Sequence, residues 1–254
     1  MTRRARTGEA GATRSRSDSA LPAPDSLEAV SREVIACEAC PRLRAHCRQV
    51  AETRRAAYRD ETYWGRPVPS FGDSRARILV VGLAPGAHGA NRTGRLFTGD
   101  RSGDFLFASL HRCGLANQPA SRGVDDGLRL RGLLISAVAR CAPPENRPEP
   151  EEIRRCRGFL EREILCLSRL RLAVALGRIA FDGLWAALEG LGFEVPKPRP
   201  RFAHGAETSA AGGRPFVLAS YHPSQQNTQT GRFTAPMCDA IFRRAREVAG
   251  LTSP

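Results

Sequence analysis

Short apolar runs separated by helical patterns organise most of this chain. Four runs have the length and residue types of buried strands: 77–83, 132–139, 170–176 and 215–221. Apolar residues recur at helical spacing between and after them, near 102–113, 151–168, 178–190 and 235–248. Because strands that alternate with helices form βαβ units, this order predicts a parallel sheet covered by helices on both faces.

The remaining segments set the limits of the folded part. Residues 1–24 are rich in Arg, Ser, Gly and Ala and hold almost no large apolar residues, which predicts a disordered basic arm. A helix is expected from Asp25 onward, with apolar residues at helical spacing between Leu27 and Ile35. The stretch 191–214, rich in proline and glycine, is typical of a connector. We therefore expect one α/β domain over residues 25–254.

Three polar loops directly follow predicted strands, at 84–103, 140–150 and 222–234. Parallel sheets bind ligands at the carboxyl ends of their strands, so a functional site is expected where these loops meet. The first loop is rich in glycine, yet it contains neither G-x-G-x-x-G nor G-x-x-x-x-G-K-[ST]. It therefore lacks the diagnostic residues of a nucleotide-binding loop.

The last polar loop, YHPSQQNTQTGRFT at 221–234, brings a histidine to a strand end. Held by Pro223, His222 can donate a hydrogen bond to negative charge that develops on a leaving group. A purely structural histidine is the alternative. The uncharged side chains that follow can approach a nucleic-acid groove closely: Ser224, Gln225, Gln226 and Asn227.

The cysteines suggest a metal centre. Cys37 and Cys40 form C-x-x-C, the spacing at which two thiolates reach one metal. Cys141 ends the second predicted strand, and Cys156 lies in a helix beyond a proline-rich loop that can return this pair to the first. Four thiolates can hold a zinc ion or a [4Fe–4S] cluster, and spacing leaves both open, as it leaves open two ordinary core cysteines. Cys47 is a further candidate ligand, while packing better explains the rest: Cys113, Cys166 and Cys238.

Composition narrows the class of partner. The formal net charge is +13 and the isoelectric point about 10.5, which favours a polyanionic partner. Nearly all of this charge is arginine, since Lys197 is the only lysine, and arginine binds phosphate and stacks on bases. A GC-rich coding sequence would give the same bias. We expect no membrane helix and no secretory signal, and hence a cytoplasmic protein.

Three motifs, taken in order, carry a family resemblance. GLAPGAHGANRTGRLFTGD, ARCAPPENRPEPEE and HPSQQNTQTGR, with the C-x-x-C upstream, closely resemble the family 5 (type B) uracil-DNA glycosylases. The resemblance runs from about Leu27 to the carboxyl-terminal helix. It implies the uracil-DNA glycosylase fold, a three-layer α/β/α sandwich with a central four-stranded, mostly parallel sheet. It also implies a [4Fe–4S] cluster bound by Cys37, Cys40, Cys141 and Cys156.

The resemblance further implies a monofunctional DNA glycosylase. Such an enzyme flips a damaged base out of DNA, hydrolyses its N-glycosidic bond with an activated water and so starts base-excision repair. The implied catalytic residues are Asp100, Asn146, which places the water, and His222, which stabilises the departing base. A helix N-cap and a turn residue are the alternative roles of Asp100 and Asn146. Lys197 lies in the connector, which argues against a Schiff-base mechanism.

On this resemblance the glycine-rich loop is a pocket for a base and its sugar. Its glycines let backbone approach the nucleotide, and Phe97 is expected to stack on the flipped base. Substrate contacts are expected from Gly82, Ala84, Gly86, Phe97, Ala137 and His222. DNA contacts are expected from Arg92, Arg95, Ser224, Gln225 and Gln226, the two glutamines acting as a wedge in the duplex.

Two positions depart from the patterns of related classes. Leu83 stands where those classes place an acid or amide just after the first-strand glycine. Ala137 stands where a sister class reads uracil with an asparagine. We therefore expect a monomer that accepts uracil and other damaged bases in double- and single-stranded DNA, associated with the nucleoid. The alternative is a non-catalytic nucleic-acid-binding protein with a structural zinc or iron–sulfur site.

Overall fold

One mixed sheet forms the centre of the protein. The computed structural model describes residues 25–210 and 215–251, so the predicted basic arm at 1–24 lies outside the described residues. The strands within them are β1 (Phe71–Gly72), β2 (Ile78–Gly82), β3 (Leu133–Ala137), β4 (Leu172–Leu176), β5 (Glu207–Ser209) and β6 (Phe216–Ser220). They are arranged in the order β1-β3-β2-β4-β6-β5.

The four strands expected from the apolar runs are β2, β3, β4 and β6, and they pair in parallel at the centre of the sheet. The expected count of four is too low for the whole sheet, because β1 and β5 add an antiparallel strand at each edge. These edge strands span two and three residues, too few to show an alternating pattern in the sequence. The three-layer α/β/α architecture is confirmed.

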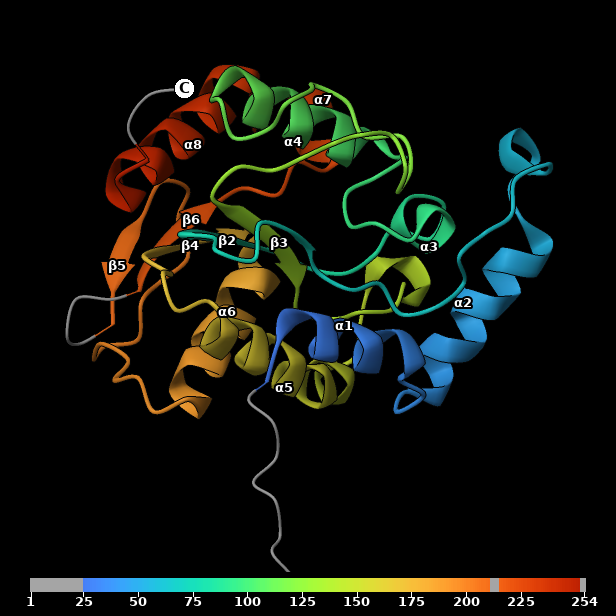
Figure 1. Ribbon diagram of the computed structural model, residues 1–254, viewed down its shortest axis with the longest axis horizontal. Coiled ribbons are helices and arrows are strands. Elements are labelled where there is room, and N and C mark those ends of the chain that lie inside the picture. The colour runs from blue at the N-terminus through green and yellow to red at the C-terminus, as the bar shows by residue number, and fades with distance from the viewer. Residues whose placement is uncertain (1–24, 211–214, 252–254) are drawn as a thin grey trace, which may run out of the picture.

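Helices cover both faces of the sheet (Figure 1). One face carries α4 (Arg101–Arg112) and α8 (Ala235–Ala249), with the short α7 (Gln225–Gln229) nearby. The other face carries α5 (Pro150–Cys166) and α6 (Arg178–Gly190), and α1 (Leu27–Ala36) packs outside α5. The remaining helical segments are α2 (Pro41–Thr53), η1 (Ala56–Tyr58), α3 (Ala90–Thr93) and η2 (Pro144–Asn146). No helix in the described ranges is both long and apolar enough to cross a membrane.

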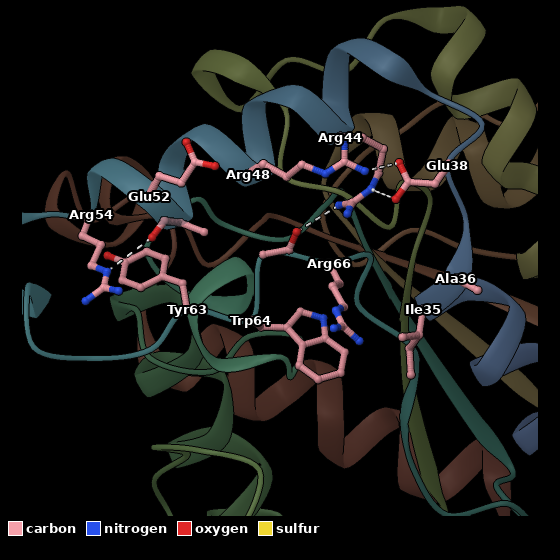
Figure 2. Close-up of a pocket in the computed structure, with 12 residues that line it drawn as sticks. Ile35, Ala36, Glu38, Arg44, Arg48, Glu52, Arg54, Tyr63, Trp64 and Arg66 are labelled. Atoms are coloured by element: carbon pink, nitrogen blue, oxygen red, sulfur yellow. Dashed lines mark hydrogen bonds and ion pairs between the residues drawn. The ribbon is translucent and has the colours of Figure 1, made fainter.

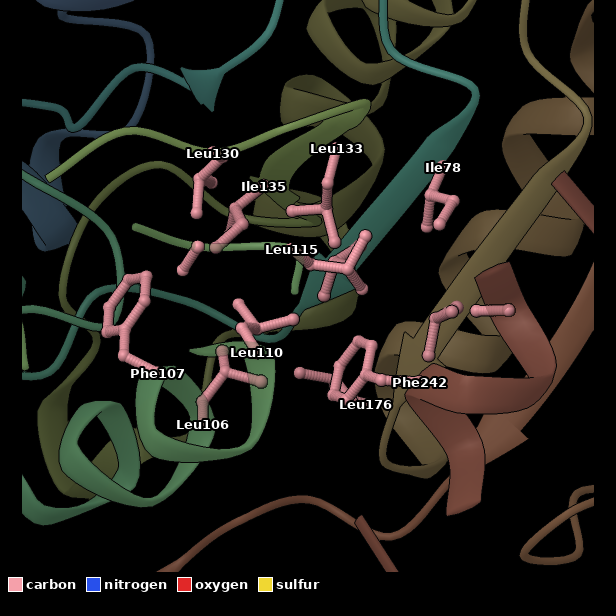
Figure 3. Close-up of a cluster of buried hydrophobic side chains, with 14 of the residues drawn as sticks. Ile78, Leu106, Phe107, Leu110, Leu115, Leu130, Leu133, Ile135, Leu176 and Phe242 are labelled. Carbon is pink, nitrogen blue, oxygen red and sulfur yellow. The ribbon is translucent and has the colours of Figure 1, made fainter. Parts of the chain in front are cut away.

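The first of these faces is closed by α4, whose sequence dictates both its start and its orientation. Asp100 is the N-cap, and its side chain accepts a hydrogen bond from the Gly103 N–H at 2.9 Å. Leu106, Phe107 and Leu110 lie on one side of the helix at helical spacing and are fully buried. Figure 3 shows these three side chains packed against residues of the sheet and of α8.

The strand order places a crevice at the carboxyl edge of the sheet. The chain leaves β2 and β6 toward the face with α4 and α8, but it leaves the intervening β4 toward the opposite face with α6. Such a divergence is where parallel sheets bind ligands. The loops that follow β2 and β6 therefore flank the place where a site is expected.

Candidate active site

The glycines at the end of β2 make room for an aromatic ring. A Cβ atom on Gly82 would lie 2.7 Å from the Phe97 Cζ atom, so the ring rests directly on the backbone of the strand end. Gly103 is equally tight, since a Cβ there would lie 1.7 Å from the Phe97 carbonyl oxygen. Phe97 itself has a φ of +54°, which an L residue rarely adopts and which the surrounding contacts must hold.

Asp100 lies in the same loop with its two carboxylate oxygens in different roles. Oδ1 accepts from the Gly103 N–H and caps α4. Oδ2 lies over two other glycines, and a Cβ on Gly89 would lie 2.2 Å from it, one on Gly86 3.0 Å. Burial raises the pKa of Asp100 above its ordinary value, although hydrogen bonds from the backbone N–H groups of Gly103 and Ser102 act to lower it. A carboxylate with a raised pKa is better matched to accepting a proton near neutral pH.

A cavity of about 430 Å³ opens beside this carboxylate. Its lining is strongly polar and comprises Tyr58, Glu61, Arg92, Gly99, Asp100, Arg101, Asp104, Ser121 and Arg122. The segment that contributes Tyr58 and Glu61 comes from beyond α2, far from the loop in sequence. No pattern in the sequence indicates that contact.

His222 reaches the crevice from the end of β6. Its ring centroid lies 6.0 Å from that of Phe97, with 32° between the ring planes. The backbone is fixed by Asn227, whose Nδ2 donates to the His222 carbonyl at 2.9 Å, and by close approach to Gly177 at the end of β4. Burial lowers the pKa of His222 to about 4, so its imidazole is neutral near pH 7. A neutral ring carries one N–H, which can donate to a leaving group without a buried charge.

The structure thus brings Phe97, Asp100 and His222 to one edge of the sheet. Ala137 joins them at the end of β3, where it pairs in register with Gly82 and is buried. Ala84 lies two residues after Gly82, in the loop that follows β2, and is partly buried. The glycines leave room for Phe97 and Asp100 side chains. Close approach of their backbone to a nucleotide remains a prediction.

The guanidinium group of Arg92 is engaged inside the protein. It donates to the carbonyl oxygens of His88 at 2.8 Å and Gly99 at 3.0 Å, and it forms an ion pair with Glu61. It also lies 3.9 Å over the Tyr58 ring, and the residue is buried. Through these contacts Arg92 joins His88 to Gly99, eleven residues later in the glycine-rich loop. Arg92 also lines the cavity beside Asp100, and its expected DNA contact stays a prediction.

Arg95 is likewise internal. Its guanidinium donates to Asp126 at 2.6 Å and to Ser121 at 2.7 Å, and it lies 4.8 Å over the Phe71 ring. Burial acts to raise the pKa of Asp126, but hydrogen bonds from Arg95 and from backbone N–H groups outweigh it and lower that pKa to about 2. Asp126 is therefore a permanent counter-ion at neutral pH. These contacts give Arg95 a structural role, and its expected DNA contact stays a prediction.

Asn146 is more exposed than the partly buried Phe97, Asp100 and His222. It is exposed in η2 with a φ of +57°, and Glu145 before it has a φ of +53°. Two successive left-handed residues are the signature of a turn, a conformation that asparagine tolerates well. A role in placing the water remains a prediction.

The loop after His222 forms the short helix α7. Ser224 is its N-cap and accepts from the Asn227 N–H at 3.3 Å, so this side chain is occupied in starting the helix. Gln225 and Gln226 lie in the first turn and are exposed. They remain candidates for the wedge.

The predicted metal region contains five cysteines, Cys37, Cys40, Cys47, Cys141 and Cys156. Cys40, Cys47 and Cys141 belong to one buried cluster. The Cys47 thiol donates to the carbonyl oxygen of Ala142 at 3.6 Å, next to Cys141 in the chain, and Cys47 and Cys141 are both buried. Burial raises the pKa of Cys156, and the neighbouring Cys40 and Cys37 raise it further. All five are free thiols. Within 25–210 and 215–251, however, no three Cys, His, Asp or Glu side chains are grouped as they would be around a metal ion.

Comparison with known proteins adds to this geometry. The family model described as "Uracil DNA glycosylase superfamily" matches residues 69–246. A type-5 uracil-DNA glycosylase of Thermus thermophilus is 51% identical over 224 residues, which cover 88% of this chain and 99% of that protein. One of Pyrobaculum aerophilum is 46% identical over 85% of this chain and 91% of its own length. A type-4 uracil-DNA glycosylase of Archaeoglobus fulgidus is 26% identical over 79% of this chain.

Proposed function

The chain belongs to the uracil-DNA glycosylase superfamily, and we propose that Asp100, His222 and Phe97 carry its chemistry. It is a uracil-DNA glycosylase, an enzyme that hydrolyses the N-glycosidic bond of uracil in DNA and starts base-excision repair. The alternative of a non-catalytic nucleic-acid-binding protein is not favoured. The single observation that supports the residue roles is that a carboxylate with a raised pKa lies in the same short loop as Phe97, whose ring lies 6.0 Å from that of a neutral histidine.

The proposed reaction divides the developing charge between two residues. As the N-glycosidic bond breaks, its electron pair leaves with the base and positive charge builds on C1′ of the sugar. The Asp100 carboxylate stabilises that positive charge and orients a water, whose oxygen bonds to C1′ while Asp100 Oδ2 accepts its proton. His222 donates its N–H to a carbonyl oxygen of the departing base and so stabilises the negative charge there.

Phe97 is proposed to stack on the extruded base. Its ring is fixed against Gly82 on one side and lies 6.0 Å from the His222 ring, so a base packed on it would be within reach of that histidine. Ala137 offers no polar group to read the base edge. We therefore propose that the pocket accepts other deaminated or damaged bases beside uracil.

The cysteines fit a metal centre in donor chemistry. Cys40, Cys141 and Cys156 are buried free thiols, and Cys37 is partly buried beside them. Burial without a partner disfavours their thiolate forms, whereas a bound metal would stabilise those thiolates. We propose that Cys37, Cys40, Cys141 and Cys156 hold a [4Fe–4S] cluster. When bound, it would tie the start of α2 to the end of β3 and to α5, a structural contribution away from the reacting atoms.

The forms of DNA that the enzyme binds and its oligomeric state are further proposals. Its positive charge suits double- and single-stranded DNA alike, and we propose that the enzyme acts as a monomer associated with the nucleoid. Light scattering at the concentrations used for activity checks the monomer. A stable dimer would contradict it.

The test is single-turnover excision of uracil from a duplex, read as strand cleavage after alkali. Asp100→Asn keeps an N-cap of similar quality and should fold normally, yet it should slow excision by roughly 10²-fold or more. His222→Ala should slow it by a similar factor. The matched controls are Asp182→Asn, exposed on α6 at the opposite face of the sheet, and His111→Ala, exposed near the end of α4. Near-normal excision by Asp100→Asn with a normal fold would place the catalytic carboxylate elsewhere.

A further inference from the structure

A second cavity, of about 630 Å³, opens between α2 and the segment 63–66. Figure 2 shows Arg44, Arg48 and Glu38 above Trp64 and Arg66, with Glu52 and Arg54 to the left. Four arginines face two glutamates in its lining, an excess of two positive charges: Arg44, Arg48, Arg54 and Arg66 against Glu38 and Glu52. Neither the reaction nor the proposed cluster ligands use these residues.

The positive charges of this cavity differ in how fully they are occupied. Arg44 is buried, and it donates to the Gly65 carbonyl at 3.1 Å and to Glu38 at 3.3 Å, so it belongs to the framework. Arg48 shares Glu38 at 2.6 Å and is exposed. Arg66 is also exposed and pairs with no carboxylate among the described residues; its guanidinium lies 5.8 Å over the Trp64 ring. Arg48 and Arg66 therefore have donors to offer a ligand.

The wall of this cavity is joined to the loop of the active site. The backbone N–H of Trp64 donates to the Arg92 carbonyl at 2.9 Å, and the backbone N–H of Gly65 donates to the Asn91 carbonyl at 3.0 Å. Trp64 also packs against Gly94, where a Cβ would lie 3.0 Å from its ring. The cavity thus adjoins α3, in the loop that carries Phe97 and Asp100. A DNA strand with one nucleotide in the active site has neighbouring phosphates close by.

We propose that this cavity is a phosphate subsite, in which Arg48 and Arg66 bind the backbone of the damaged strand beside the extruded nucleotide. The proposal rests on the proposed function, because it takes DNA as the ligand. A guanidinium presents paired N–H donors that match phosphate oxygens, and most protein–DNA hydrogen bonds go to the backbone. The arginines of this subsite are exposed, whereas Arg92 and Arg95 are buried.

The variants Arg48→Gln and Arg66→Gln, single and combined, test this subsite. Both positions are exposed, so the variants should fold. Arg169→Gln is the matched control, since Arg169 is exposed in the turn before β4, at the opposite edge of the sheet. Binding is measured by fluorescence anisotropy, at several salt concentrations, on a duplex that carries one uracil nucleotide in a form that cannot be cleaved. Single-turnover excision at saturating enzyme is measured separately.

Each arginine removed should lower the slope of log K against log[salt] by about 0.9, the value for one phosphate contact in duplex DNA. The double variant should bind roughly tenfold more weakly at low salt, with the single-turnover rate at saturation nearly unchanged. Wild-type affinity and slope in the double variant would overturn the subsite. An equal loss in Arg169→Gln would show only general charge attraction, and a loss of excision without a loss of affinity would show a role in site geometry. Failure of the wild type to excise uracil would count against the function instead.

Discussion

The active-site loop and the cysteine region are built in opposite ways. The loop at 82–103 supplies its aromatic ring, its carboxylate and the glycines that make room for them from 22 consecutive residues. The cysteine region, defined by Cys37, Cys40, Cys47, Cys141 and Cys156, draws its thiols from segments more than 90 residues apart. Local contacts fix the first, whereas the second depends on long-range packing.

This difference has a consequence for how each region tolerates change. Positions in the loop are fixed by backbone contacts, so a small substitution there should alter rate more than stability. In the cysteine region three buried thiols have a raised pKa, and their thiolates need a stabilising partner: Cys40, Cys141 and Cys156. A substitution there should alter the amount of folded protein more than the rate per folded molecule.

Replacing a proposed cluster ligand should therefore have the largest effect. Cys156→Ser should abolish visible absorbance and bound iron and sharply lower the yield of folded protein, because thiolate ligation contributes directly to folding. Cys166→Ser, at the end of the same helix, is the control and should retain both. Absorbance spectra with iron and sulfide analysis after anaerobic purification provide the measurement.

Two outcomes would contradict the assignment of a [4Fe–4S] cluster to the cysteine region. A colourless wild type with one zinc per chain would replace the cluster by zinc and leave the fold intact. A wild type with neither metal would make these cysteines core residues.

A methyl group on the loop should have the next largest effect. The Gly89→Ala Cβ would lie 2.2 Å from Asp100 Oδ2, so the carboxylate must move. A displacement on the order of 1 Å costs about 10²-fold in rate when it misplaces a catalytic group. Gly123→Ala is the control, since nothing lies within 4 Å of its Cβ. The rate of single-turnover excision is measured for both variants, with thermal unfolding in parallel to check their stability. An unchanged rate in Gly89→Ala would show that Asp100 tolerates displacement.

The candidate site could be predicted from the sequence because its signals are local. A buried run, a glycine-rich loop and an N-cap aspartate are neighbours in the chain, and the parallel order of strands brings His222 to the same edge. The roles of Arg92 and Arg95 were not predictable, because their partners Glu61 and Asp126 lie about 30 residues away without a recognisable pattern. The edge strands β1 and β5 span two and three residues, too few to give a recognisable strand pattern in the sequence.

The exposed glutamines of α7 should give the smallest and most selective effect. Extruding a base costs a few kcal/mol of pairing and stacking, and less when the base is mismatched. If Gln225 and Gln226 wedge the duplex, replacing both by alanine should slow excision several-fold from A·U, less from G·U and least from single strands. Parallel single-turnover assays on the three substrates test this order. An equal loss on all three would make α7 part of the pocket.

The pH dependence of single-turnover excision, measured for the wild type and Asp100→Asn at saturating enzyme, tests the central claim most directly. Asp100 must be ionised to accept a proton, so the wild-type rate should rise with pH through its raised pKa and reach a plateau above that pKa. His222, with a pKa of about 4, should add no inflection between pH 6 and 7. Asp100→Asn should lower the plateau roughly 10²-fold or more and remove the inflection assigned to Asp100. A variant that keeps the wild-type plateau and the same acid limb would contradict the assignment of Asp100 as the group that activates water.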